Sequence, residues 1–163
     1  LDQLFPFPLD GFQLEAIDAL NQGHSVVVSA PTGSGKTLVG EYAIHRALAH
    51  GQKVFYTTPL KALSNQKLRD FREQFGSERV GLMTGDLTVN REARIVVMTT
   101  EIFRNMLYAE AESGDDPLAD VEAVVLDECH YMNDSQRGTV WEESIIHCPP
   151  SVQLVALTWV PRT

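Results

Sequence analysis

Short apolar runs alternate with amphipathic stretches along the whole chain. Six runs rich in apolar and β-branched residues predict strands at 24–29, 53–57, 79–83, 94–98, 122–127 and 152–157. Most of these runs are apolar on both faces, as in Val26-Val27-Val28. That pattern is typical of parallel strands covered by helices on both sides.

Between these runs, apolar residues recur at helical spacing. The three clearest stripes comprise Phe12, Ala16, Ile17 and Leu20; Val39, Tyr42, Ala43 and Ala47; and Leu68, Phe71 and Phe75. A further helix is predicted after Thr100, a suitable N-cap, and another over about 137–147. Strands that alternate with helices indicate an α/β fold with a mostly parallel central sheet, and such sheets bind ligands at the carboxyl ends of their strands.

The stretch Ala-Pro-Thr-Gly-Ser-Gly-Lys-Thr at 30–37 follows the first apolar run directly. A strand that breaks into a glycine loop and restarts as a helix presents backbone N–H groups and a helix N-terminus to an anion. Lys36 can reach the outer phosphates of a nucleotide, and the Thr37 hydroxyl can ligate Mg²⁺. The residues expected to hold the nucleotide phosphates are Thr32, Gly33, Ser34, Gly35, Lys36 and Thr37.

A second chemical signal closes the apolar run 122–127, which delivers Asp127 and Glu128 to the same edge of the predicted sheet. Phosphoryl transfer needs mainly positioning and charge neutralisation. Asp127 is expected to hold the Mg²⁺ and Glu128 to orient and deprotonate the attacking water. The sequence therefore predicts an ATP site with Mg²⁺, in which Lys36, Asp127 and Glu128 are the catalytic residues.

Composition narrows the class of protein. The 163 residues suit one domain, and no apolar run approaches the roughly 20 residues of a membrane span. The net charge of −9 disfavours a surface that binds nucleic acid throughout, but it allows a local site near Lys61 and Lys67. The acidic stretch 110–120 is expected to be a surface loop. The two cysteines form no disulfide framework, which favours an intracellular protein, cytoplasmic or nuclear or organellar.

Asp127-Glu128-Cys129-His130 resembles the DExH box of superfamily-two helicases, and the loop at 30–37, with Ala30 first, resembles their phosphate-binding motif. The segment 57–67, Thr-Thr-Pro-Leu-Lys-Ala-Leu-Ser-Asn-Gln-Lys, is similar to the nucleic-acid-contacting segment of the Ski-like, exosome-associated RNA helicases. The resemblance covers nearly the whole chain. It implies that residues 1–163 form a single RecA-like, P-loop NTPase domain with helices on both faces of the sheet.

The resemblance also implies a set of binding residues. Phe7 and Gln13, within the segment 1–23, match the adenine-recognition segment: the ring can stack on the base, and the amide can pair with its edge. The residues implied to contact a single nucleic-acid strand are Thr58, Pro59, Lys61, Thr84, Gly85 and Thr100. His130 and Thr158 are implied to couple hydrolysis to strand separation. Phosphate contacts of this kind give little base specificity and an affinity that falls with salt.

The pattern departs from the family at its third motif, Ser-Ala-Thr, where this chain has Thr158-Trp159-Val160. No second RecA-like domain follows within the 163 residues, so we expect this stretch alone to bind nucleotide weakly and to show little ATPase activity. Three alternatives remain at this stage: a DNA helicase of the same superfamily, a non-catalytic nucleotide-binding module, and a metal site. The metal site would use Cys129, His130, His147 and Cys148, whose spacing matches no zinc pattern.

Overall fold

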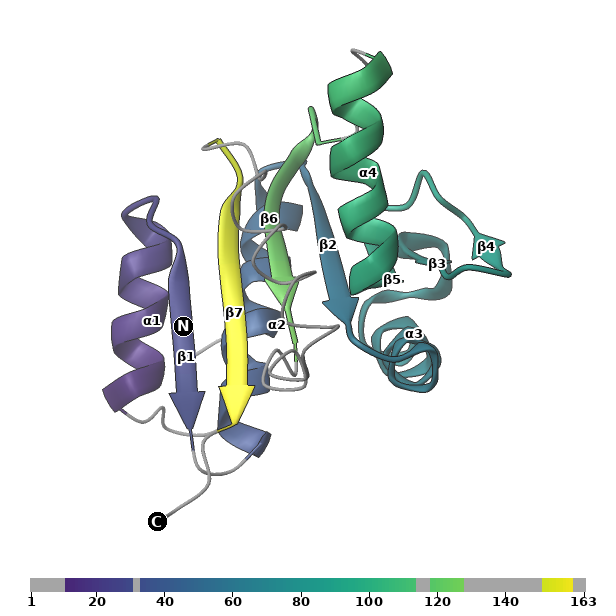
Figure 1. Cartoon of the computed structure of the whole chain (residues 1–163). Helices are drawn as coiled ribbons and strands as arrows, with labels where there is room; N and C mark the ends of the chain where they lie inside the picture. The colour runs from purple at the N-terminus through teal and green to yellow at the C-terminus, as the bar shows by residue number, and fades with distance from the viewer. Residues whose placement is uncertain (1–10, 31–32, 114–117, 128–150, 160–163) are drawn as a thin grey trace.

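The computed structural model describes residues 11–30, 33–113, 118–127 and 151–159. In these residues a seven-stranded sheet forms the centre of the molecule, in the spatial order β1-β7-β6-β2-β5-β3-β4 (Figure 1). Every neighbouring pair is parallel except β3 and β4. The strands are β1 (Val26–Ala30), β2 (Lys53–Thr58), β3 (Val80–Met83), β4 (Thr88–Val89), β5 (Ile95–Thr99), β6 (Val121–Leu126) and β7 (Gln153–Trp159).

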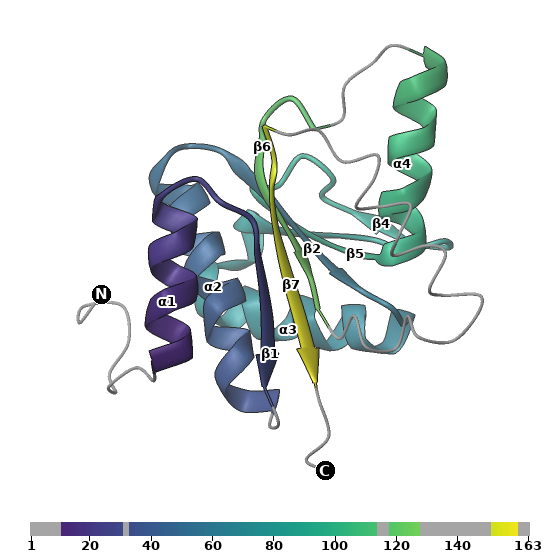
Figure 2. The same ribbon diagram turned by 60° about the vertical axis from the view of Figure 1, so that its left-hand side comes forward.

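Helices lie on both faces of this sheet, as the sequence predicted. The described helices are α1 (Gly11–Asn21), α2 (Gly33–Ala49), α3 (Lys61–Phe75) and α4 (Thr100–Ser113), with a short 3-10 helix at Ser77–Arg79. Figure 2 shows α1, α2 and α3 on one face of the sheet and α4 on the other. The α/β class and the mostly parallel sheet are therefore confirmed.

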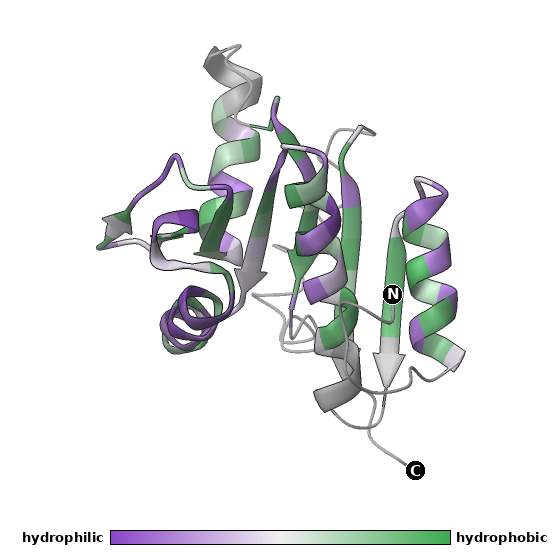
Figure 3. Cartoon of the chain, turned by 180° about the vertical axis from the view of Figure 1, so that it is seen from behind, coloured by the Kyte–Doolittle hydropathy of each residue, from purple (hydrophilic) through white to green (hydrophobic). Residues whose placement is uncertain are grey.

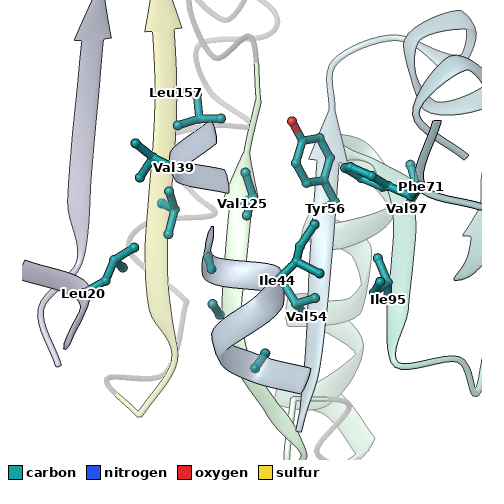
Figure 4. Packing of buried hydrophobic residues seen from close by; sticks show 14 of the residues in the cluster. Leu20, Val39, Ile44, Val54, Tyr56, Phe71, Ile95, Val97, Val125 and Leu157 are labelled. Atoms are coloured by element: carbon teal, nitrogen blue, oxygen red, sulfur yellow. The ribbon is translucent and has the colours of Figure 1, made fainter. Parts of the chain in front are cut away.

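The two largest apolar clusters of the described residues correspond to the two faces, and a small third one joins Ile17 and Leu38. The larger core joins α1, α2 and α3 to the sheet and includes Leu20, Val39, Ile44, Tyr56 and Phe71 (Figure 4). The smaller core packs α4 residues such as Phe103 and Leu107 against strand residues of the opposite face. Seen from behind, the strands are largely hydrophobic, whereas α3 is mostly hydrophilic (Figure 3). Helix α3 therefore buries only a narrow stripe, centred on Ser64 and Phe71.

Helix α2 lies unusually close to the sheet at Gly40. A Cβ atom added there would approach Leu157 and Val125 side-chain atoms to 3.3 Å and the Tyr56 ring to 3.4 Å. Such distances leave little room for any side chain, since protein cores are close-packed. The absence of a side chain at position 40 therefore lets α2 rest directly over β7, β6 and β2.

Three details differ from the sequence-based expectations. Val27 is 69% exposed, because β1 lies at a sheet edge and α4 contacts β5 and β2 instead. In α1 the buried stripe begins at Gln13, and Phe12 is 36% exposed at its border. Residues 110–113 of the acidic stretch, expected to be loop, form the end of α4, whose helical run continues through Ala109 and Ala111.

Two further differences concern element number. The two-residue strand β4 was not predicted, since two residues carry no usable periodicity. The six predicted strands all form within two residues of their expected ends. The helix predicted over about 137–147 lies outside the described residues.

Candidate functional site

The carboxyl ends of the parallel strands bring the predicted chemistry to one edge of the sheet. β1 ends at Ala30, before the glycine loop, and β6 ends at Leu126, before Asp127. The arrowheads of β1, β7, β6 and β2 point the same way in Figure 1. The edge formed by these ends is called the carboxyl edge below, and it is where an open α/β sheet binds ligands.

The loop predicted to bind phosphates has the expected position between a strand and a helix. β1 is followed after two residues by α2, which begins at Gly33 and contains Ser34, Gly35, Lys36 and Thr37 in its first turns. The N-terminus of this 17-residue helix offers free backbone N–H groups and a positive partial charge to an anion. Thr37 is partly buried there. Thr32 lies outside the described residues.

Asp127 is buried and hydrogen-bonded, but one of its two carboxylate oxygens lacks a described hydrogen-bond partner. Asp127 is 3% exposed, and its backbone N–H donates to the Thr57 carbonyl over 2.9 Å. The Tyr56 hydroxyl donates a 2.5 Å hydrogen bond to Asp127 Oδ2. The other carboxylate oxygen, Oδ1, is buried and has no hydrogen-bond partner among the described residues. A buried carboxylate oxygen without a partner is costly, unless a ligand completes it.

This carboxylate fits the Mg²⁺ that the sequence implies. Mg²⁺ prefers oxygen ligands and is typically bound through one or two carboxylates plus substrate phosphates. Asp127 Oδ1 supplies such an oxygen at the same sheet edge as the phosphate loop. Asp127 and Thr37 are the described residues that would hold the ion, which would neutralise charge on the phosphates.

Lys67 of α3 lies beside the same carboxylate. Its ammonium is 4.0 Å from Asp127 Oδ2, and its side chain is 21% exposed. The ammonium also lies 5.6 Å from the centre of the Tyr56 ring and 5.8 Å from that of Phe71. Figure 4 shows the Tyr56 ring beside Phe71, with its hydroxyl oxygen directed toward the strands' carboxyl ends. Tyr56 and Lys67 thus surround one side of Asp127.

A hydroxyl network joins the ends of β2 and β5 to α3. The Thr58 hydroxyl contacts the Ser64 hydroxyl at 2.8 Å and the Leu60 carbonyl at 2.9 Å. Thr100 donates to the Thr58 carbonyl over 3.1 Å. Thr58 and Ser64 are fully buried and Thr100 is 3% exposed. These hydroxyls therefore hold the loops in place, and a phosphate could reach them only by displacing these bonds.

The loop after β3 is fixed to the start of α3 by charge. Lys61 forms an exposed ion pair and hydrogen bond with Asp86. The Thr84 hydroxyl lies 3.1 Å from Asp86 Oδ1 and 3.3 Å from the Leu87 carbonyl. The hydrogen bond from Lys61 is the main cause that lowers the pKa of Asp86 below its ordinary value. Lys61 and Gly85 are exposed at this point, whereas Thr84 is buried.

The remaining predicted residues fall in three groups. Gln13 is 4% exposed in α1, so it is not a solvent-exposed helix residue. Thr158 lies within β7, paired with Ser29 of β1, so the strand continues past the expected end at 157. Phe7, Glu128 and His130 lie outside the described residues. The two cysteines and two histidines of the alternative metal site do so as well.

Sequence reasoning missed Tyr56 and Lys67 as partners of Asp127. The available signals were a phenol within an otherwise apolar strand, and a lysine four residues before Phe71 on the buried stripe of α3. Neither signal names Asp127, because the contact joins residues far apart in the chain. Among the described residues, no group of three metal-ligating side chains is found, and no helix is long and apolar enough to cross a membrane.

Comparison with known proteins agrees with this geometry. Residues 10–159 match the DEAD/DEAH box helicase family. The chain is 57% identical over 161 residues to the DExH-box ATP-dependent RNA helicase DExH15 of Arabidopsis thaliana, covering 97% of this chain and 14% of that protein. It is 52% identical to the antiviral helicase SKI2 of Saccharomyces cerevisiae, covering 98% of this chain and 12% of the relative. It is also 52% identical to the human exosome RNA helicase MTR4, covering 94% and 14%.

Solved structures share the fold. The helicase Lhr of Mycobacterium smegmatis, bound to single-stranded DNA and AMP-PNP, superposes with a TM-score of 0.67 at 27% identity, covering 96% of this chain and 23% of that one. The helicase MrfA gives a TM-score of 0.71 at 19% identity, covering 93% and 27%, which supports the fold alone.

The chain spans only 12–14% of the length of the curated relatives named above. Its own family is nevertheless clear, because the match to that family runs from residue 10 to residue 159. The relatives at 52–57% identity include SKI2 and MTR4, which bears out the resemblance to the Ski-like group. This chain therefore belongs to the DEAD/DEAH box helicase family, as a helicase domain homologous to the ATP-dependent RNA helicases.

Proposed function

We propose that this chain is the first motor domain of an ATP-dependent RNA helicase of the Ski-like group, which hydrolyses ATP to translocate on RNA or to unwind it. One observation carries the proposal: Asp127 Oδ1, which has no hydrogen-bond partner in the described part of the chain, lies at the same sheet edge as the glycine loop. A buried acceptor without a described partner, at the same sheet edge as a helix N-terminus that can bind an anion, suits a metal–nucleotide complex. The similarity to RNA helicases extends this site to a motor.

Each residue of the ATP site has a distinct role in this proposal. The loop N–H groups and Lys36 bind the phosphates, while Thr37 and Asp127 hold the Mg²⁺. Glu128 accepts a proton from the attacking water as that water approaches the phosphorus. Phe7 stacks on adenine and Gln13 pairs with its edge. Because these contacts neutralise charge on the phosphates, hydrolysis requires little covalent chemistry from the protein.

The strand-binding part of the proposal rests on the loops that surround the start of α3. Lys61 and Gly85 are exposed there, and Pro59 is partly exposed. Thr58, Thr84 and Thr100 contribute through the loop backbone that their buried hydroxyls hold in place. We infer that an RNA strand lies along these loops and contacts them mainly through its phosphates, with RNA preferred over DNA by contacts to the 2′-hydroxyl.

The complete reaction needs groups beyond the described site. A second RecA-like domain supplies arginine to the phosphates, and such an arginine is typically worth about 10³–10⁵ in rate. His130 and Thr158 couple phosphate release to movement of the two domains. An intracellular location suits a protein that acts on RNA.

ATPase activity of the full-length protein that carries this chain tests the proposal. We expect single-stranded RNA to stimulate hydrolysis, and Lys36→Ala to remove that activity. Arg91→Ala is the matched control, since Arg91 is an exposed cation remote from the strands' carboxyl ends. Competition between RNA and DNA strands of the same sequence then decides the substrate. Equal stimulation by DNA would contradict the RNA assignment, and no nucleic-acid stimulation would contradict the motor itself.

A further inference from the structure

A lysine ammonium close to a metal-binding carboxylate is an unusual arrangement, because both cations need the same negative charge. Lys67 lies 4.0 Å from Asp127 Oδ2 and retains only 21% of its side-chain exposure. No hydrogen bond from its ammonium accounts for this position among the described contacts, and two aromatic rings add cation–π attraction. Among the described residues, the carboxylate of Asp127 forms an ion pair with this ammonium, so its charge contributes to holding Lys67 there.

The two carboxylate oxygens of Asp127 have different surroundings. Oδ2 accepts the Tyr56 hydrogen bond and faces Lys67, while Oδ1 has no partner among the described residues. A metal ion that uses Oδ1 would consequently bind a carboxylate whose other side already faces a positive charge. Two cations near one carboxylate repel each other, and a site shielded from water weakens that repulsion less than bulk water does.

We propose that Lys67 is an internal counter-ion that competes with Mg²⁺ for the charge of Asp127, so that metal affinity depends on where α3 holds this lysine. The proposal rests on the proposed function, since it takes Asp127 as the Mg²⁺ carboxylate. Lys67 touches neither nucleotide nor reacting atoms in this account, and it acts only through Asp127.

The surroundings of Lys67 offer its ammonium a second negative partner. Glu41 of α2 lies within electrostatic reach of Lys67, and its carboxylate also hydrogen-bonds to Gln74 of α3. Helix α2 begins at the phosphate loop, and β6 ends at Asp127. Two carboxylates on different elements thus lie in the surroundings of the ammonium, Asp127 after β6 and Glu41 of α2. If Lys67 leaves Asp127, Glu41 offers it another negative partner.

Helix α3 also connects Lys67 to the loops proposed to bind RNA. It begins at Lys61, which pairs with Asp86 in the loop after β3. One turn further, Ser64 contacts Thr58 at the end of β2. Binding of an RNA strand at this end of α3 would therefore affect the position of Lys67, which lies about two helical turns along the same helix. If RNA draws Lys67 away from Asp127, RNA and Mg²⁺ strengthen each other's binding, because such coupling is reciprocal.

The test is the Mg²⁺ concentration that half-saturates binding of a fluorescent, non-hydrolysable ATP analogue to the full-length protein. We expect Lys67→Met to lower this concentration about threefold to tenfold, since removing one nearby like charge shifts ion binding by roughly that much. Arg69→Met is the matched control, because it removes an exposed cation from the same helix. Lys67→Arg keeps the charge and should behave like the wild type. Melting temperatures confirm that each variant is folded.

Single-stranded RNA supplies the second arm. In the wild type, we expect RNA to lower the half-saturating Mg²⁺ concentration, and in Lys67→Met to leave it unchanged. An unchanged or raised Mg²⁺ requirement in Lys67→Met without RNA would overturn the proposal while leaving the ATP site intact. Failure of the wild type to bind the analogue at any Mg²⁺ concentration would instead contradict the proposed function, and the counter-ion role with it.

Discussion

Polar groups are paired to different extents at the two edges of the central sheet. The edge at which the parallel strands begin is called the amino edge here, and it lies opposite the carboxyl edge. At the amino edge, Gln153 at the start of β7 donates to the carbonyls of Leu20 and His24, each over 2.9 Å, and accepts from Arg46 over 2.6 Å. Glu122 pairs with His50 through Oε1, and its Oε2, which has no hydrogen-bond partner among the described residues, lies 3.5 Å from a guanidinium nitrogen of Arg46. At the carboxyl edge, Asp127 has one satisfied oxygen and one without a partner among the described residues.

This difference distinguishes polar groups that stabilise the fold from a polar group that is available to bind a ligand. Buried polar groups normally satisfy each other, and the amino edge largely follows that rule with bonds that join α1, α2, β6 and β7. Its one acceptor without a hydrogen bond among the described residues, Glu122 Oε2, still has the Arg46 guanidinium beside it. An acceptor such as Asp127 Oδ1, which has neither a hydrogen bond nor an ion pair among the described residues, is the exception that needs a ligand to explain it. By the same criterion, the threonines at the carboxyl edge stabilise the loops, because their hydroxyls are hydrogen-bonded within the protein.

Asp127→Asn should produce the largest effect. The amide keeps an oxygen for the Tyr56 hydrogen bond but loses the charge that attracts Mg²⁺, so we expect kcat of the ATPase to fall about 10³-fold, as when other electrostatic stabilisers are removed. The free energy of unfolding should change by less than about 1 kcal/mol. Steady-state ATPase and urea unfolding measure both. Activity near the wild-type value would contradict the metal role of Asp127.

Gln153→Leu should give the reverse pattern at the amino edge. The substitution leaves two carbonyl oxygens and Arg46 without their amide partner. Each unpaired buried group is costly, so we expect unfolding to become easier by about 2–3 kcal/mol. Below the melting transition, kcat should stay within about twofold of the wild type. A selective loss of kcat in a folded protein would show that the amino edge takes part in function.

Tyr56→Phe examines the bond that orients Asp127. It removes one hydroxyl and keeps the buried ring, so we expect the half-saturating Mg²⁺ concentration to rise about threefold to tenfold, equivalent to one lost hydrogen bond of about 1 kcal/mol. Tyr42→Phe is the matched control, because it removes an exposed hydroxyl that donates to Asn21 over 2.8 Å. If both variants require the same Mg²⁺ as the wild type, Tyr56 does not position Asp127.

Glu41→Gln should give the smallest effect, and one that depends on pH. Burial is the main cause that raises the pKa of Glu41 above its ordinary value of 4.5. A raised pKa in the folded state means that Glu41 favours folding below about pH 4.5 and loses that contribution as the pH rises through its folded pKa. The stability advantage of Glu41→Gln should therefore grow as the pH is raised from 4 to 7. A pH-independent difference in unfolding free energy would contradict this assignment.

The sequence predicted those features that depend on local pattern. The glycine loop, the apolar strand before Asp127 and the stripe of α2 each lie within one short segment, so their geometry followed from neighbouring residues. The contact of Tyr56 and Lys67 with Asp127 could not be predicted in this way, because it joins β2, α3 and β6 across the sheet.

The exposure of Val27 illustrates the same limit. An apolar triplet predicts a strand, but its two faces are buried only if helices cover both sides, and the sheet order decides that. Gln13 is the opposite case, since a polar side chain on a surface helix usually lies on the exposed face, yet Gln13 is buried with the apolar stripe of α1. In both positions the tertiary arrangement overrode the local preference.

The measurement that tests the account most directly is the effect of Mg²⁺ on nucleotide affinity in the wild type and in Asp127→Asn. Titration calorimetry with a non-hydrolysable ATP analogue, with and without a Mg²⁺ chelator, gives the four dissociation constants. We predict that Mg²⁺ strengthens binding to the wild type at least tenfold and leaves the affinity of Asp127→Asn nearly unchanged. An equal effect of Mg²⁺ on both proteins would show that Asp127 does not hold the metal and would contradict the site described above.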